Sequence, residues 1–155
     1  MDLAQRIARL EAIEAIKQLK AEYAKVCDDG YRPDGMRPLF TEDALWEDTA
    51  GAFGRFEGRE AICEFFRGVS EPISWALHYM IAPRIVVDDD LQGASGDWYI
   101  FMPATIGNEP VWLMGTYSER YRNEGGTWRF CHLVANIQAI TPFAEGWVET
   151  PFIGS

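Results

Sequence analysis

The sequence is short of positive charge. It holds 14 lysines and arginines against 24 aspartates and glutamates, which gives a formal net charge of −10 and a pI near 4.6. A protein that binds nucleic acid neutralises phosphates with a basic stripe, and this chain shows none. An anionic membrane surface would repel it for the same reason. We therefore expect neither nucleic acid nor membrane as a partner, and we expect a neutral or weakly polar small molecule.

Long apolar runs are also missing. No stretch approaches the ~18 uninterrupted apolar residues of a membrane-spanning helix. The N-terminal residues are amphipathic and charged throughout, without the apolar segment and cleavage site of a signal peptide. Cysteine is scarce, and Cys27, Cys63 and Cys131 match neither a zinc site nor a disulfide framework. The simplest interpretation is reduced thiols in a cytoplasmic protein.

Several signatures of catalysis are absent. The sequence has no G-x-S-x-G elbow, no P-loop and no G-x-G-x-x-G fingerprint. Its two histidines, His78 and His132, have no paired carboxylates near them in sequence, which argues against a metal site. We therefore expect an activity that needs neither a cofactor nor a metal.

The length of 155 residues suits one domain, 1–155, with 141–155 as a C-terminal extension that forms a flap or a subunit contact. Aromatic residues reach 14%, enough to fill a core or to line an apolar pocket, and composition alone leaves both open.

Hydrophobic periodicity divides the chain into a helical half and a strand half. The pattern predicts helices over 3–27, 33–40 and 59–69, a strand pair over 44–49 and 53–56, and strands over 74–87, 92–104, 111–122 and 128–140. Pro83 interrupts the first long strand and predicts a bulge or a sheet edge there. Helices on one side of a curved antiparallel sheet make an α+β fold. If the sheet curls around the long helix, its interior becomes a blind conical pocket.

Asp28 and His78 are the first candidates for proton transfer. His78 stands among large apolar residues, where a buried imidazole needs a hydrogen-bond partner, although a lone strand histidine can be purely structural. Asp28 ends the first helix, where the helix dipole opposes a negative charge. A histidine reaching in from the sheet would offset that placement, and the carboxylate would leave the second ring nitrogen free to take a proton.

Further candidates line the same predicted interior. Tyr23 lies on the apolar stripe of the first helix, as core or as a donor to a substrate oxygen. Asp48 shares strand parity with Trp46, so it either faces inward with that ring or ends the strand in solvent.

The last strand offers a further set. We expect Leu133, Ala135 and Ile137 to face the pocket, which turns His132 to the opposite face.

Five segments together resemble the SnoaL-like branch of the nuclear-transport-factor-2-like superfamily. They are the helix 10–23 with Asp28 five residues on, the segment 39–44, the G-x-x-A-I start at 58–62, His78 with the strand that runs on to the acidic turn, and the stretch from Tyr121 to 126–130. The resemblance spans about residues 5–143. It implies a cystatin-like cone, with N-terminal helices on a strongly curved antiparallel sheet that encloses a pocket, and it suggests a homo-trimer.

Within that superfamily the chain resembles scytalone dehydratase, bile-acid 7α-dehydratase and hexachlorocyclohexane dehydrochlorinase. The resemblance implies Asp28 and His78 as the catalytic pair and matches Tyr23 to a tyrosine of the bile-acid enzyme. Asp48 stands where the dehydratases place a substrate-holding tyrosine. Leu133 and Ile137 stand where the dehydrochlorinase and the bile-acid enzyme carry arginines. The catalytic pair is therefore retained, whereas the residues around it that would contact the substrate differ. We call these residues the recognition shell and expect Trp46 and Asp48 to be part of it.

The favoured hypothesis is a dehydratase-type lyase that acts on a small cyclic or aromatic hydroxy-carbonyl compound by His/Asp acid–base catalysis. Polyketide cyclisation and double-bond isomerisation need the same pair. A non-catalytic ligand-binding cone would keep it as a satisfied buried contact. Apolar side chains on the outer sheet face favour a homo-oligomer.

Overall fold

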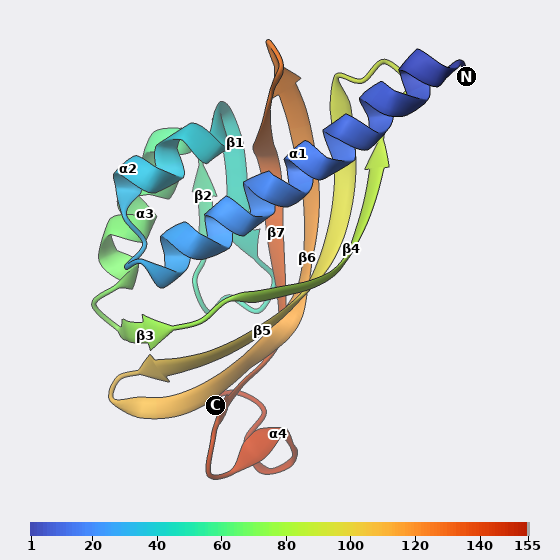
Figure 1. The fold of residues 1–155 in the computed structure, drawn as a ribbon. Helices are drawn as coiled ribbons and strands as arrows, with labels where there is room; N and C mark the ends of the chain where they lie inside the picture. Colours follow the sequence, from blue (N-terminus) through green and yellow to red (C-terminus); the bar gives the residue numbers. More distant parts are fainter. Residues whose placement is uncertain (155) are drawn as a thin grey trace.

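One long helix lies across a sheet that curls around it (Figure 1). The structure is a computed structural model and describes residues 1–154. Its helices are α1 (Leu3–Asp28), α2 (Pro33–Met36), α3 (Arg59–Val69) and α4 (Gly146–Glu149), with a 3-10 turn at Arg37–Leu39. Its strands are β1 (Phe40–Asp48), β2 (Arg55–Glu57), β3 (Ile73–Ala76), β4 (Tyr79–Val87), β5 (Gly93–Ile106), β6 (Glu109–Glu124) and β7 (Thr127–Pro142). In this part of the chain, no helix combines the length and the apolar character needed to cross a membrane.

The sheet follows the order β2-β1-β7-β6-β5-β3, and β4 also pairs with β5. The predicted α+β cone is confirmed, with one difference in its sheet. β1 runs parallel to β7, whereas the other pairs are antiparallel. A parallel pair needs a long crossover connection. Here the whole segment from β2 to β6 forms that connection. A prediction that pairs each strand with its neighbour in the sequence could therefore not reveal the pair of β1 and β7.

The prediction of a single strand over 74–87 is wrong. The segment forms β3 and β4, which pair with successive parts of β5 and leave Leu77 and His78 between them. The bulge expected at Pro83 is confirmed, because the register with β5 shifts between Ile81 and Arg84. The gap between β3 and β4 matters most, because it frees the backbone of His78 for another partner.

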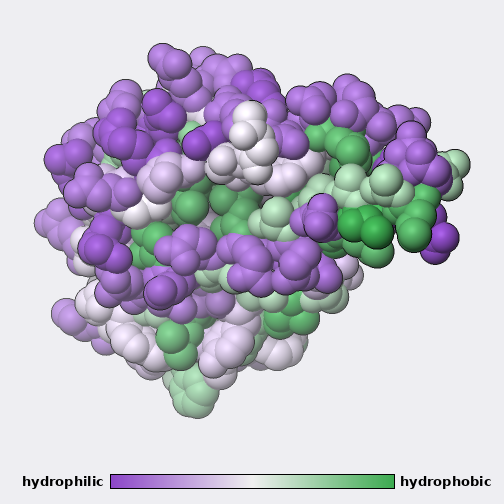
Figure 2. All heavy atoms as spheres, turned by 45° about the horizontal axis from the view of Figure 1, so that its top comes forward, coloured by the Kyte–Doolittle hydropathy of each residue, from purple (hydrophilic) through white to green (hydrophobic). Residues whose placement is uncertain are grey.

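Helix α1 begins at a reciprocal cap and buries one stripe. The Asp2 side chain accepts from the Gln5 backbone at 2.8 Å, and the Gln5 side chain accepts from the Asp2 backbone at 2.9 Å. Its buried residues are Ala12, Ile16, Leu19, Lys20, Tyr23, Val26 and Cys27. Apolar residues in the first turns of α1 are not buried in this way. Figure 2 shows apolar side chains at the end of the molecule where α1 begins, and Leu3 and Leu10 are exposed there.

A buried ion pair joins α1 to the sheet. Lys20 and Glu119 contact each other, and both side chains are fully buried. The second carboxylate oxygen of Glu119 accepts from the Tyr121 hydroxyl, which accepts the Trp98 indole N–H at 3.0 Å. The Lys20 ammonium also lies 3.4 Å from the centre of the Tyr117 ring. Burial lowers the pKa of Lys20, and the Glu119 carboxylate opposes that effect.

The C-terminal extension folds back on the end of β7. The Ile140 backbone donates to the Pro151 carbonyl at 2.9 Å and accepts from the Ile153 N–H at 2.8 Å. The extension was predicted over 141–155, but β7 itself continues to Pro142. Ser155 lies outside the described residues.

Candidate active site

The end of α1 sets the position of Asp28. Gly30 has φ 84°, and its N–H donates to the Cys27 carbonyl at 3.3 Å, while the Tyr31 N–H reaches back to the Val26 carbonyl at 3.0 Å. These two bonds form a glycine C-cap, which satisfies the last carbonyls and turns the chain sharply. Asp28 therefore sits in the last turn of the helix, facing β3 and β4 where the sheet strands separate.

The Asp28 carboxylate binds His78 twice. Its Oδ1 atom accepts the His78 backbone N–H at 2.9 Å and the ring Nδ1 at 2.8 Å. The two donors offset the unfavourable position of a carboxylate at a helix C-terminus. Because an ionised carboxylate only accepts, the neutral imidazole carries its proton on Nδ1 and leaves Nε2 with a free lone pair. The predicted contact between these residues is therefore present.

The dyad separates an interior cavity from an outer groove. The His78 side chain is 5% exposed, and His78 lines both the cavity and a groove between α1 and β4. The Asp28 side chain is 30% exposed and lines the groove but not the cavity. An imidazole that faces an apolar interior, with its carboxylate on the outer side, can act as a base toward a ligand in the cavity.

Tyr31 approaches the other ring nitrogen. Its hydroxyl is 3.5 Å from Nε2 of His78, at the outer limit of a hydrogen bond. The ring is stacked on Phe66 with centroids 6.0 Å apart. Tyr31 has φ 57°, a left-handed conformation that costs a non-glycine residue about 1 kcal/mol. The fold thus holds a strained residue at the proton-accepting atom of the dyad.

The cavity is small, and its lining is rich in aromatic residues. Its volume, measured as the space open to the centre of a water molecule, is about 40 Å³. The wall includes Tyr23, Tyr31, Trp46, Phe53, Phe65, Phe66 and Tyr117, with aliphatic residues between them. A dry aromatic wall around one imidazole favours apolar ring compounds as ligands.

Three phenols supply hydrogen-bond donors to this interior. Tyr23 accepts the Trp46 indole N–H at 3.2 Å, and its ring meets the Tyr117 ring edge-on with centroids 6.3 Å apart. Burial raises the pKa of Tyr23, Tyr31 and Tyr117 well above the ordinary value for tyrosine. Each phenol therefore keeps its proton at neutral pH and can donate to a ligand oxygen.

The predicted recognition shell is only partly brought together. Trp46 and Ile137 line the cavity with Tyr23 and His78. Leu133 is fully buried and does not line the cavity, which reaches β7 at Ala135 and Ile137, and its contact with a ligand stays a prediction.

Asp48 does not line the cavity, and its contact with a substrate stays a prediction. Its carboxylate accepts the backbone N–H groups of Ala52, Phe53 and Gly54 at 3.1, 2.7 and 2.7 Å. Because β1 ends at Asp48, strand parity with Trp46 no longer directs the side chain inward. The residue instead organises the turn between β1 and β2, from which Phe53 reaches the cavity wall.

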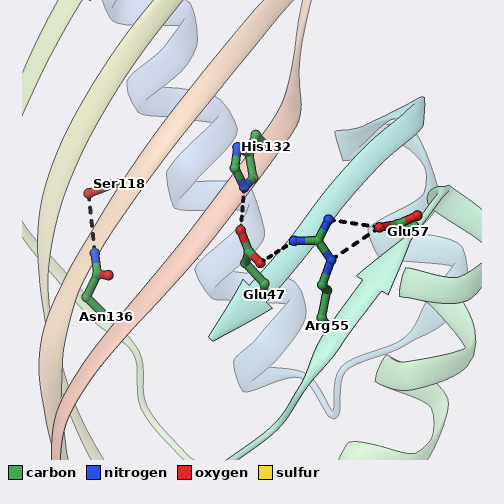
Figure 3. Close-up of polar contacts among 6 residues, drawn as sticks. All are labelled: Glu47, Arg55, Glu57, Ser118, His132 and Asn136. Atoms are coloured by element: carbon green, nitrogen blue, oxygen red, sulfur yellow. Dashed lines mark hydrogen bonds and ion pairs between the residues drawn. The ribbon is translucent and has the colours of Figure 1, made fainter. Parts of the chain in front are cut away.

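His132 points away from the cavity, as expected. Figure 3 shows it with Glu47, Arg55 and Glu57. Its Nε2 atom is 2.9 Å from the Glu47 carboxylate, which also pairs with Arg55 at 2.7 Å. The hydrogen bond between Glu47 and His132 is the largest cause that lowers the pKa of Glu47, and the bond between Glu47 and Arg55 lowers it further. This exposed cluster makes His132 a natural control for His78.

Sequence reasoning missed Tyr31, Tyr117 and the phenylalanines of the wall. Tyr117 alternates correctly along β6 and could have been found by parity. Tyr31 follows Gly30 in an irregular segment, where no periodicity indicates a direction.

Comparisons with known proteins agree on the fold. No curated protein matches the chain in sequence. A hexachlorocyclohexane dehydrochlorinase, LinA-type3 of Novosphingobium barchaimii LL02, is 20% identical, with a TM-score of 0.80 over 90% of this chain and 94% of that one. A candidate scytalone dehydratase of Novosphingobium aromaticivorans is 20% identical, with a TM-score of 0.78 over 97% of this chain and 98% of that one.

A third solved structure shares the fold. It is an NTF2-like protein with a cystatin-like fold from Novosphingobium aromaticivorans, 19% identical, with a TM-score of 0.73 over 87% of each chain. Likeness at such identities shows the fold alone. The model of the SnoaL-like domain matches residues 8–134, which is most of the chain. The chain therefore belongs to the family of SnoaL-like domains.

Proposed function

We propose that this protein is a cofactor-independent dehydratase-type lyase that acts on a small cyclic or aromatic hydroxy-carbonyl compound. The observation that carries the proposal is the 2.8 Å contact between Asp28 and Nδ1 of His78, with Nε2 unprotonated at an aromatic cavity. His78 removes a proton beside the substrate carbonyl, and Asp28 holds the tautomer and stabilises the imidazolium. General acid–base catalysis of this kind contributes about 10²–10⁴-fold.

The buried phenols support the second requirement of the reaction. Proton removal beside a carbonyl places negative charge on the carbonyl oxygen, and preorganised donors stabilise such charge in a dry site. Tyr23 and Tyr117 are neighbours on the cavity wall, and both are neutral donors because burial raises their pKa. The same feature favours a second candidate, double-bond isomerisation, which passes through an enolate without losing a leaving group.

Substrate entry requires the wall to move. A cavity of about 40 Å³ holds about three water molecules, less than a ring compound needs. Phe53 reaches the wall from the turn between β1 and β2, where the chain is irregular and partly exposed. We propose that this turn yields when a substrate enters.

The test is turnover of 3-hydroxyindan-1-one, a cyclic β-hydroxyketone whose dehydration gives a conjugated product that can be followed by its absorbance. His78→Gln should lower the rate by about 100-fold or more, since it removes the base. His132→Gln is the matched control and should leave the rate unchanged. Absence of turnover by the wild type, or equal rates in both variants, would reject the proposal. Conversion of a β,γ-unsaturated ketone without dehydration would favour the isomerase.

The expected homo-oligomer stays a prediction. A row of rings on the outer sheet face connects Tyr79, Phe101, Trp112 and Phe143, with neighbouring centroids 5.2–6.2 Å apart. Tyr79 and Phe143 are among its exposed members. We propose this row as the contact surface between copies.

A further inference from the structure

Dehydration needs an acid as well as a base. Hydroxide is a poor leaving group, so the departing oxygen must receive a proton as its bond to carbon breaks. His78 has a free Nε2 lone pair before the reaction and can accept a proton there, but it cannot give that proton away in the same step. A second proton donor near Nε2 would let both transfers occur together.

We propose that Tyr31 is the catalytic acid that protonates the departing hydroxyl group. The inference rests on the proposed dehydration and adds a residue to it. The Tyr31 hydroxyl lies 3.5 Å from Nε2 of His78, so base and acid face the same point of the cavity wall. Such contacts often tighten when a substrate binds.

The surroundings of Tyr31 fix the direction of its hydroxyl. The ring stacks on Phe66 and meets the His78 ring edge-on, with centroids 5.7 Å apart. Its backbone is held in the left-handed region immediately after the glycine C-cap of α1. Within residues 1–154, its hydroxyl has no hydrogen-bond partner other than Nε2 of His78. The group is therefore rigidly placed and free to serve a ligand.

The other cavity phenols are less suited to this role. Tyr23 accepts the Trp46 indole N–H, and the Tyr117 ring meets it edge-on. Those two phenols suit the carbonyl oxygen, whereas Tyr31 suits the leaving group. Burial keeps Tyr31 protonated at neutral pH, so it begins the cycle as a donor.

The proposed step balances without a co-reactant. The C–H proton moves to Nε2 of His78, and the C–H electron pair becomes the new carbon–carbon double bond. The C–O bond breaks, and the departing oxygen takes the Tyr31 proton and leaves as water. The imidazolium then returns its proton from Nε2 to the Tyr31 oxygen, which restores both residues.

The experiment separates acid from base with two substrates. Exchange of the C2 hydrogens of indan-1-one with deuterium oxide, followed by NMR, needs only the base. Dehydration of 3-hydroxyindan-1-one needs the base and the acid. Tyr31→Phe keeps both ring contacts and removes the hydroxyl. Tyr99→Phe is the matched control, because Tyr99 is exposed outside the cavity.

Tyr31→Phe should lose about 100-fold or more in dehydration and keep exchange within about threefold of the wild type. Retained exchange also shows that the variant is folded with a working dyad. Undiminished dehydration in Tyr31→Phe would overturn the role of Tyr31 and leave the proposed function intact. Equal losses in both reactions would also overturn it, because Tyr31 would then act only by positioning His78. A wild type inactive in both reactions would overturn the proposed function and this inference together.

Discussion

Replacing Lys20 by methionine tests the buried ion pair, because it removes the ammonium and keeps most of the side-chain volume. Glu119 would then be a carboxylate in the core, with the Tyr121 hydroxyl as its remaining donor. Both members of the pair have no exposed surface, so water cannot compensate the loss.

The magnitude follows from that burial. Removing one partner of a buried pair costs about 3–5 kcal/mol, a large share of the ~5–15 kcal/mol that stabilises a domain. For a chain of this size the melting temperature should fall by about 10 °C. Replacing both residues, as Lys20→Met with Glu119→Gln, removes the unpaired charge. The double variant should therefore lie within about 2 kcal/mol of the wild type.

The assay is a double-mutant cycle measured by urea unfolding, with tryptophan fluorescence and circular dichroism as separate probes. Trp98 belongs to the same network and reports its integrity. We expect a coupling energy of at least about 2 kcal/mol between the two substitutions. Additive losses, or a loss below about 1 kcal/mol in Lys20→Met, would show that the pair is not a desolvated unit.

Three further predictions concern the turn, the outer face and the sheet. Asp48→Ala should cost about 1 kcal/mol and speed proteolysis within 49–54, because three backbone N–H groups lose their acceptor; unchanged proteolysis would contradict this. The pKa of Glu47 is depressed by His132, so its stabilising contribution is present above its unfolded pKa and is lost as pH falls. The urea midpoint should thus drop from about pH 5 to about pH 3, and Glu47→Gln should drop less. Gly115→Ala should destabilise by about 2 kcal/mol, since the new methyl meets a backbone carbonyl of β7. Gly68→Ala, in open space on α3, is its control and should not destabilise.

Regular elements were predictable because one physical pattern dominates each of them. Helix α3 follows its apolar spacing to the residue, over 59–69. The Asp28–His78 contact was predictable because two residues with unsatisfied requirements also stand at the positions that the resemblance to the SnoaL-like family pairs. The helix dipole opposes the negative charge of Asp28 at the helix C-terminus, and the His78 imidazole needs a hydrogen-bond partner among its apolar neighbours. Its presence does not establish a catalytic role, which stays a proposal.

The remaining features depend on irregular backbone or on distant partners. Tyr31 is placed by two successive left-handed residues, which no periodicity encodes. Lys20 lies on the buried stripe of α1, where a lysine is ordinarily solvated, and its partner Glu119 is 99 positions away. Parity with Trp46 left Asp48 either facing inward or ending the strand in solvent, and the structure shows its carboxylate bound to the turn that follows β1.

The position of the proton on the His78 ring is the measurement that tests the proposed function most directly. Long-range ¹⁵N–¹H correlation of the two histidines, with His132→Gln used to assign them, reports the tautomer when the ring is neutral. We expect the proton of His78 on Nδ1, with Nε2 unprotonated, and a mixture of tautomers in Asp28→Asn. A neutral His78 with its proton on Nε2 in the wild type would contradict the proposed function, because Nε2 could then not accept a proton from a ligand in the cavity.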